Sequence, residues 1–280
     1  MKEGAESNNK NLLLEMCIDE NTFELALKFV KETKTTLRLE ICSELGAEGF
    51  TPHDETVLLC LSEPLFEHTN LNIMIRPKLQ ASHDLGTCGM IDSFCYDDQA
   101  LEIMKMQIRS MKKLLAQEKD KVKNREIGFV LGCIERTQSG TIAINTFALQ
   151  EIIDVIQEPC ELCHRFSVTF HKAFDLLSNP IESVQLLAAL GVDRILTSLN
   201  FGCEDLKGKA MNSIQQFNNK NTEILKHFLQ AVGNMQDASK VILLIGGDVR
   251  ENNHLELVKF FEKYPQIRFE LHSSTPFKIK

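Results

Sequence analysis

Hydrophobic and polar positions along the chain fall into two alternating patterns. Short runs rich in β-branched and other apolar residues predict strands at residues 12–18, 36–42, 71–76, 127–133, 167–171, 194–197, 241–245 and 268–272. Amphipathic segments between these runs predict helices near residues 22–33, 54–62, 97–117, 146–157, 180–190, 221–232 and 251–261. Strands that alternate with helices are typical of a parallel sheet. The pattern therefore predicts an α/β protein that folds as a single (β/α)₈ barrel, the TIM-barrel fold.

An open, doubly wound sheet is the alternative architecture for this pattern. No Gly-x-Gly-x-x-Gly follows the first predicted strand, which argues against a dinucleotide-binding fold and against a nucleotide cofactor. The even repetition of the units also suits closure into a barrel. In such a barrel the functional groups gather on the rim at the carboxyl ends of the strands.

The segments outside the predicted strands and helices indicate where the barrel domain begins and where its long loops lie. Residues 1–11 are polar and predict a disordered N-terminal tail, so the barrel domain is expected to span residues 12–280. Two connections are long, at residues 77–96 and 199–221. Both follow a strand, so both are expected on the functional rim.

Composition and charge limit the classes of function. The net charge of −8 argues against a general role in binding nucleic acid or an anionic membrane. No apolar run is long enough to span a bilayer, and the N-terminus lacks the apolar core of a signal peptide. Nine cysteines without such a signal indicate reduced thiols, and so a cytoplasmic protein without membrane partners.

Two Glu-x-Cys units mark equivalent positions on the first two predicted strands. Glu15 and Cys17 share one face of the first strand, and Glu40 and Cys42 share one face of the second, because side chains alternate with a period of two. The intervening residues are apolar and are expected to meet the helices, so the Glu-x-Cys faces point into the barrel. Neighbouring strands lie about 4.8 Å apart. Cys17 and Cys42 can therefore offer two sulfurs to one soft metal ion, and thiolates select Cu(I).

The same region also predicts an enzyme of unknown reaction as an alternative. The polar side chains expected near the barrel mouth are Glu15, Glu40, Arg76, His171, Lys172 and His272. In this hypothesis the two glutamates and His171 act as catalytic acid and base groups. Arg76, Lys172 and His272 would hold a small, anionic substrate.

Less specific interpretations remain open for these residues. Buried carboxylates need partners, and Arg38 and Arg76 are the nearest cations at the matching parity, so the set can be a structural ion network. Each cysteine can be an ordinary core residue. A regulatory barrel that binds a partner protein through residues 199–221 is a third hypothesis, and the inward direction of the polar residues argues against it.

Two further motifs bear on cofactors. Residues 160–164, Cys-Glu-Leu-Cys-His, match the pattern of covalent haem attachment. They fall in a connection at the opposite end from the rim, and that chemistry belongs outside the reducing cytosol, so no haem is expected. Gly246 and Gly247 follow the seventh strand, where many barrels bind phosphate on backbone amides. Asp248 adds a negative charge there and argues against phosphate.

Seven short stretches, in order along residues 12–275, resemble the CutC family, described as copper homeostasis proteins. They are Leu-Glu-Met-Cys-Ile (14–18), Arg-Leu-Glu-Ile-Cys-Ser (38–43), Glu-Gly-Phe-Thr-Pro (48–52), Ile-Met-Ile-Arg-Pro (73–77), Phe-Cys-Tyr-Asp-Asp (94–98), Thr-Phe-His-Lys-Ala-Phe-Asp (169–175) and Leu-Gly-Val-Asp-Arg-Ile-Leu-Thr-Ser (190–198). The resemblance implies a TIM barrel, a cytoplasmic setting with presence in the nucleus left open, and a homo-oligomer (dimer or tetramer). It also implies a Cu(I) site at Cys17 and Cys42, with the copper ion as the partner.

The sequence departs from the family pattern mainly at the rim. The family usually has Arg where this chain has Lys172, which keeps the charge but loses the planar guanidinium group. It usually has Pro-Gly-Gly-Gly where residues 245–248 read Ile-Gly-Gly-Asp, and Phe-His-Gly-Ser where residues 271–274 read Leu-His-Ser-Ser. The Gly-rich stretch that usually follows Arg-Pro is replaced by a longer insertion. These departures affect an anion-binding role more than the cysteine pair.

Overall fold

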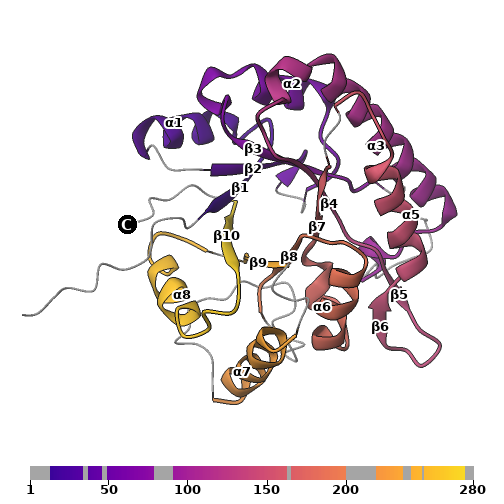
Figure 1. Ribbon diagram of the computed structural model, residues 1–280, viewed down its shortest axis with the longest axis vertical. Helices are drawn as coiled ribbons and strands as arrows, with labels where there is room; N and C mark the ends of the chain where they lie inside the picture. The colour runs from indigo at the N-terminus through magenta and orange to yellow at the C-terminus, as the bar shows by residue number, and fades with distance from the viewer. Residues whose placement is uncertain are drawn as a thin grey trace, which may run out of the picture.

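The protein is a closed barrel of eight parallel strands, seen in a computed structural model that describes residues 13–33, 37–45, 49–78, 91–162, 165–199, 219–235, 241–247 and 249–274. The barrel strands are β1 (Leu14–Ile18), β2 (Leu37–Ile41), β3 (Asn70–Met74), β4 (Ile127–Leu131), β7 (Ser167–Phe170), β8 (Arg194–Thr197), β9 (Ile242–Ile245) and β10 (Phe269–Ser273). They follow one another around the barrel in chain order, and β10 closes it by pairing with β1 (Figure 1). The predicted TIM-barrel fold is confirmed.

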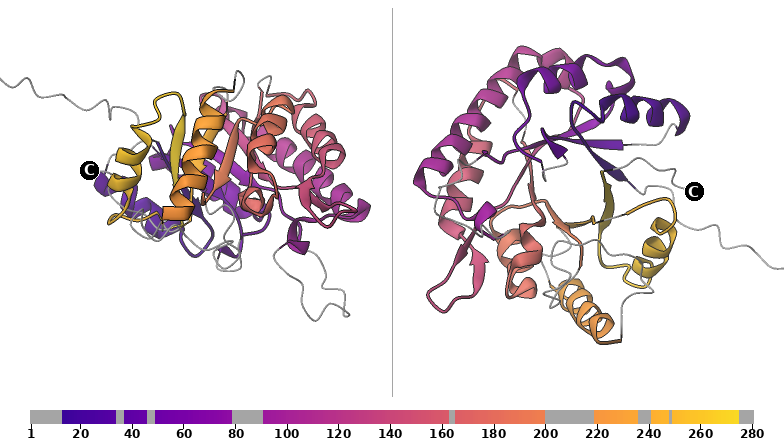
Figure 2. Two further views of the ribbon diagram at one scale, coloured as in Figure 1. Left: turned by 90° about the horizontal axis from the view of Figure 1, so that it is seen from below. Right: turned by 180° about the vertical axis from the view of Figure 1, so that it is seen from behind.

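The helices form an outer ring around these strands (Figures 1 and 2). Their bounds are α1 (Phe23–Thr33), α2 (Asp54–Ser62), α3 (Asp98–Gln117), α4 (Lys119–Val122), α5 (Thr146–Gln157), α6 (Pro180–Ala189), α7 (Asn219–Gly233) and α8 (His254–Phe261). Short 3₁₀ helices are η2 (Pro64–Phe66), η3 (Asp92–Phe94) and η4 (Lys172–Leu176). Local signals begin three of the helices: Asp97, Asn145 and Asn179 accept hydrogen bonds from backbone N–H groups in the first turns of α3, α5 and α6.

The barrel strands β1 and β2 are buried on both of their faces. Every residue of β1 and β2 is buried, because one face of each strand meets the helices and the other meets the barrel interior. Leu14, Met16 and Ile18 of β1 belong to the main hydrophobic core. The inward face carries Glu15 and Cys17 instead, as the alternation predicts.

A hairpin and a short helix were not predicted from the sequence. After β4, β5 (Ile134–Arg136) and β6 (Ile142–Ile144) pair antiparallel and project away from the barrel (Figure 2). Their turn is closed by hydrogen bonds between residues 137 and 141, and Gly140 has a φ of 82°. Three-residue strands carry too little alternation to be recognised. The helix α4 directly follows α3, and its four residues are too few to show a helical pattern of their own.

Some predictions concern residues outside the described part of the chain. These are the tail at residues 1–11 and most of the two long connections, since residues 79–90 and 200–218 are not described. Among the helices of the described residues, none has the length and apolar character needed to cross a membrane.

The amino-terminal ends of the strands are closed by a group of charged residues, here called the lower ion cluster. Its members are Glu15, Arg38, Glu126, Arg194 and Glu270. Arg38 pairs closely with Glu270, lies 3.3 Å from Glu126 and 3.8 Å from Glu15. Arg194 pairs closely with Glu126 and places Nε 3.6 Å from Glu270. Arg38 was expected from the sequence as a partner of Glu15, whereas the other three members were not expected.

Candidate metal centre and cavity

The two cysteines lie together at the carboxyl ends of β1 and β2. Cys17 is paired in register with Glu40, so Cys42 lies two residues further along the chain, directly after the last residue of β2. The two sulfurs are 3.6 Å apart. The thiol of Cys17 donates a hydrogen bond to Glu40 Oε1 at 3.1 Å, and that of Cys42 donates to the carbonyl of Ile18 at 3.5 Å.

Cys42 lies behind Cys17, away from solvent. It is fully buried and packs with Met74 and Val130. Gly49 allows this close packing, because a Cβ at that position would lie 3.3 Å from the Cys42 sulfur. Gly49 also has a φ of 77°, which favours glycine. The second sulfur is therefore held in a tight, largely apolar site.

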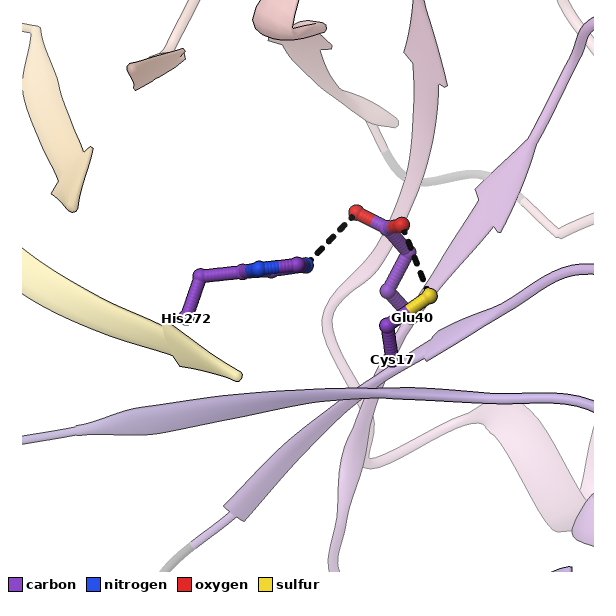
Figure 3. Close-up of side chains that lie close together, drawn as sticks. All are labelled: Cys17, Glu40 and His272. Carbon is purple, nitrogen blue, oxygen red and sulfur yellow. Dashed lines mark hydrogen bonds and ion pairs between the residues drawn. The ribbon is translucent and has the colours of Figure 1, made fainter. Parts of the chain in front are cut away.

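The carboxylate of Glu40 connects Cys17 to the last strand. Its Oε2 lies 3.5 Å from Nε2 of His272, and in Figure 3 the carboxyl group stands between the His272 ring and the Cys17 sulfur. Cys17, Glu40 and His272 each place one ligand atom within 4.8 Å of the other two, so the three residues can hold a metal ion. Closure of the barrel by β10 brings His272 to this position.

Charge and burial set the protonation states of this group. Although burial opposes both changes, the ion pair lowers the pKa of Glu40 and raises the pKa of His272. Both shifts favour the charged form of the group, the carboxylate of Glu40 and the imidazolium of His272. The hydrogen bond with Cys42, burial and the charge of Glu40 raise the pKa of Cys17 well above its ordinary value. Without a metal, Cys17 is a neutral thiol.

A cavity of about 210 Å³ opens beside Cys17 and Glu40 at the barrel mouth. Its lining consists of Cys17, Glu40, Leu45, His171, Lys172, Asp175, Leu196, Thr197, Ser198, Gly246, Gly247, His272, Ser273 and Ser274. Most of these side chains are polar. The cavity occupies the rim at which TIM barrels carry their functional sites.

The family of the chain can now be stated from its matches. The model of the CutC family matches residues 12–264. The chain belongs to the CutC family. Two relatives share it: a CutC protein of Histophilus somni is 28% identical over 256 residues (88% of this chain, 77% of its own), and the human copper homeostasis protein cutC homolog is 26% identical over 244 residues (86% and 67%). The crystal structure of CutC from Streptococcus agalactiae matches with a TM-score of 0.60 at 20% identity, covers 95% of this chain and 99% of its own, and shows the shared fold.

Within this CutC fold, only some of the candidate residues named from the sequence line the cavity. Cys17, Glu40, His171, Lys172 and His272 line the cavity. Cys42 lies directly behind Cys17. The remaining two candidates, Glu15 and Arg76, lie elsewhere.

Glu15 belongs to the level below the cavity. It is fully buried, accepts a hydrogen bond from Asn72 at 2.5 Å and lies 3.8 Å from Arg38. Burial and the charge of Glu40 raise its pKa to about 7. It is not among the residues that line the cavity.

Arg76 follows β3 and packs between aromatic rings. Its guanidinium group lies 4.5 Å from the centre of the Phe94 ring and 5.2 Å from that of Phe50, and it donates a hydrogen bond to the carbonyl of Gly49 at 3.4 Å. These contacts direct it toward the loops beside β3. It too is outside the cavity lining.

Asp175 is a cavity residue that the sequence analysis did not single out. Its carboxylate accepts hydrogen bonds from the hydroxyl of Thr197, and from both the hydroxyl and the backbone N–H of Ser198, at 2.6 to 2.9 Å. The next residue, Leu199, has a φ of 62° and donates its N–H to the Thr197 hydroxyl. Asp175 therefore shapes the chain where it leaves β8. Asp175, Thr197 and Ser198 all belong to the family-like stretches at residues 169–175 and 190–198, and this could have drawn attention to them.

The glycine-containing stretch at residues 246–248 after β9 and the haem-like motif at residues 160–164 are only partly within the described residues. Gly246 and Gly247 line the cavity, whereas Asp248 lies outside the described residues. Gly246 permits close packing, because a Cβ there would lie 2.7 Å from Leu196 and 3.3 Å from Nδ1 of His272. Cys163 and His164 of the haem-like motif also lie outside the described part.

Proposed function

We propose that this protein takes part in copper homeostasis by binding Cu(I) between Cys17 and Cys42. The observation that carries the proposal is the 3.6 Å separation of the two sulfurs. At a metal–sulfur bond length of about 2.3 Å, as in zinc–thiolate sites, this separation corresponds to an S–metal–S angle of about 100°. Little movement is needed for both sulfurs to bind one ion.

The surroundings of the pair favour a soft ion. Thiolates and thioethers select Cu(I) among the biological metals, and Met74 packs beside the two cysteines. On the open side, the imidazole of His272 is near enough to complete the coordination. The binding of the ion requires loss of the thiol protons. Glu40, which already accepts the Cys17 hydrogen bond, provides a route for one of them.

The proposed setting is the cytoplasm, and the proposed assembly is a homo-oligomer. Cys17 and Cys42 are free thiols, a state that a reducing compartment maintains. For self-association, Met106 of α3 and Phe147 of α5 are 59% and 74% exposed on two helices that pack together. A contiguous exposed apolar patch marks a protein interface, and a contact made through these two helices would cover both side chains. Light scattering of the wild type and of Phe147→Ser tests this arrangement.

The copper proposal is tested by anaerobic competition for Cu(I) against a coloured chelator. We expect the wild type to remove one equivalent of Cu(I) from the chelator, and Cys17→Ser and Cys42→Ser each to lose this uptake. Cys60→Ser is the matched control, because Cys60 is as fully buried as Cys42 but lies in α2. It is expected to bind like the wild type.

Two results would contradict the proposal. Equal uptake by the wild type and by the Cys17→Ser/Cys42→Ser double variant would place the copper elsewhere. Failure of the folded wild type to compete at all would make the pair ordinary core residues. Circular dichroism of each variant shows whether it is folded, so that a loss of copper is not mistaken for a loss of structure.

A further inference from the structure

The wall of the cavity opposite Cys17 is built by the ends of β7, β8 and β9. It contains His171, Lys172, Thr197, Ser198 and Gly246. A two-sulfur copper site has no need of this wall. Its composition, an imidazole, an ammonium group and hydroxyls around a small cavity, is typical of an active site rather than of a metal store.

His171 is fixed on this wall, and its ring makes no hydrogen bond to the part of the chain that the structure describes. It is 3% exposed, and its buried Nδ1 has no partner among the described residues. Its backbone N–H donates to the carbonyl of Leu131, its ring packs on Phe94 with centroids 5.1 Å apart, and Gly132 leaves room beside its Cβ. Buried polar groups are almost always hydrogen-bonded. An imidazole on a cavity wall, with an Nδ1 that has no partner among the described residues, therefore indicates a role toward a ligand.

Burial and the positive charges around His171 keep its imidazole unprotonated, which is the form that can accept a proton. Burial and the positive charges of Lys172 and Arg76 lower the pKa of His171 well below its ordinary value, so the ring is neutral at physiological pH. The carboxylate of Asp175, by contrast, is occupied by donors from Thr197 and Ser198. Lys172 directly follows His171 and supplies positive charge to the same cavity.

We propose that His171 is the general base, and Lys172 the stabilising cation, of an active site that transfers a proton on a small hydroxy-carbonyl compound. The C–H bond beside the carbonyl breaks, and its proton moves to the imidazole. The electron pair forms a C=C bond, and the charge that develops on the carbonyl oxygen faces the ammonium group of Lys172. The proton of the hydroxyl group on the same carbon then moves to the former carbonyl oxygen. Return of the first proton to the former carbonyl carbon completes an isomerisation, in which the two carbons exchange their carbonyl and hydroxyl groups. No electrons leave the substrate, so no cofactor is required.

The cavity limits the substrate to a small polar molecule. Its volume of about 210 Å³ is below the roughly 300–1,000 Å³ of sites for drug-sized ligands. Serine and threonine hydroxyls at the ends of β8 and β10 line it. Leu45 and Leu196 add apolar side chains to the lining. Such a lining suits hydroxyl groups and excludes an aromatic or long aliphatic ligand.

Proton transfer is detected in heavy water without knowing the product. Full-length protein, freed of metal by a chelator, is incubated with glycolaldehyde, dihydroxyacetone, glyceraldehyde and erythrulose, and proton NMR follows loss of the signal beside the carbonyl. We expect at least one compound to exchange faster with the protein than without it. His171→Asn should slow this exchange by about 100-fold or more, the usual contribution of a general base.

Lys172 offers a matched pair of variants. Lys172→Met is expected to lose most of the exchange, and Lys172→Arg to retain it, because the arginine keeps the charge. His68→Asn is the control for histidine loss, since His68 is exposed and far along the chain from the cavity residues. If His171→Asn does not fold, the Lys172 pair still decides the result.

Two outcomes would overturn the proposal. The first is that none of the four compounds exchanges above the protein-free rate. The second is that folded His171→Asn, or folded Lys172→Met, exchanges as fast as the wild type. The assay uses metal-free protein, so its outcome is independent of whether Cys17 and Cys42 bind copper.

Discussion

The barrel interior has two charged levels with different organisation. In the lower ion cluster two arginines face three glutamates, and each side chain has an oppositely charged partner. At the cavity, Glu40 has an imidazolium and a thiol as partners, and the ring of His171 has no hydrogen-bond partner among the described residues. Both levels lie on the inward faces of the same strands.

The difference separates stability from function. At the amino-terminal ends, where TIM barrels carry stability rather than chemistry, every charge of the cluster has an opposite charge beside it. The carboxyl ends keep incompletely paired groups, which natural proteins tolerate mainly at functional sites. Substitutions at the two levels should therefore change different properties, and four predictions test this.

The largest effect on stability is expected from Arg38→Met in the lower ion cluster. The substitution leaves the buried Glu15 without its arginine partner and leaves Glu126 and Glu270 to share Arg194. We expect the free energy of unfolding to fall by about 3–5 kcal/mol. Urea unfolding measures it. A loss below about 1 kcal/mol would mean that the cluster is not a stabilising element.

The second prediction concerns the pH dependence contributed by Glu15. Burial raises its pKa from 4.5 to about 7, so the folded metal-free protein holds this proton more tightly than the unfolded chain. Stability therefore falls as pH rises from about 4.5 to about 7, by up to about 3 kcal/mol. Glu15→Gln should lack this loss and gain stability over the wild type at alkaline pH. The free energies of unfolding of the wild type and of Glu15→Gln are measured across this pH range. The same dependence on pH in both proteins would contradict the prediction.

The third prediction is the pH dependence of copper binding. The pKa of Cys17 lies well above its ordinary value, so binding of Cu(I) must displace its proton. The apparent affinity should rise about tenfold, or about 1.4 kcal/mol, per pH unit for each proton released between about pH 6 and about pH 8. The chelator competition repeated across this range measures the slope. An affinity independent of pH would exclude Cys17 as a ligand.

The smallest effect on stability is expected from Lys172→Met at the cavity. Lys172 is half-buried on the rim, outside the hydrophobic core. Its loss should change the free energy of unfolding by less than about 1 kcal/mol while removing proton exchange. The same urea experiment provides the comparison with Arg38→Met. Equal losses from the two substitutions would remove the distinction between the levels.

The strands and the inward cysteines could be predicted because both depend on local alternation. A period of two assigns Glu15, Cys17, Glu40 and Cys42 to one face whatever the rest of the chain does. The strand order then follows from the short helical crossovers. These features need no knowledge of distant contacts.

Partners across the barrel could not be predicted in this way. Parity along the strands pointed to Arg76 as a cation for the glutamates, but Arg76 lies beyond the end of β3 and packs on Phe94. Glu40 pairs with His272, which reaches it through closure of β10 against β1. Asp175 acts through a 3₁₀ turn that has no distinct sequence pattern. Each of these contacts depends on the closed barrel.

The two sulfurs are 25 residues apart in the chain, whereas His272 comes from the last strand. During synthesis β1 and β2 leave the ribosome early, and pairing of these two strands alone brings the sulfurs together. The cavity is complete only when β10 closes the barrel. In the proposed copper binding, the nascent chain would acquire a metal clip between its first two strands before the proposed active site is complete, and the bound ion would join the first elements of the fold.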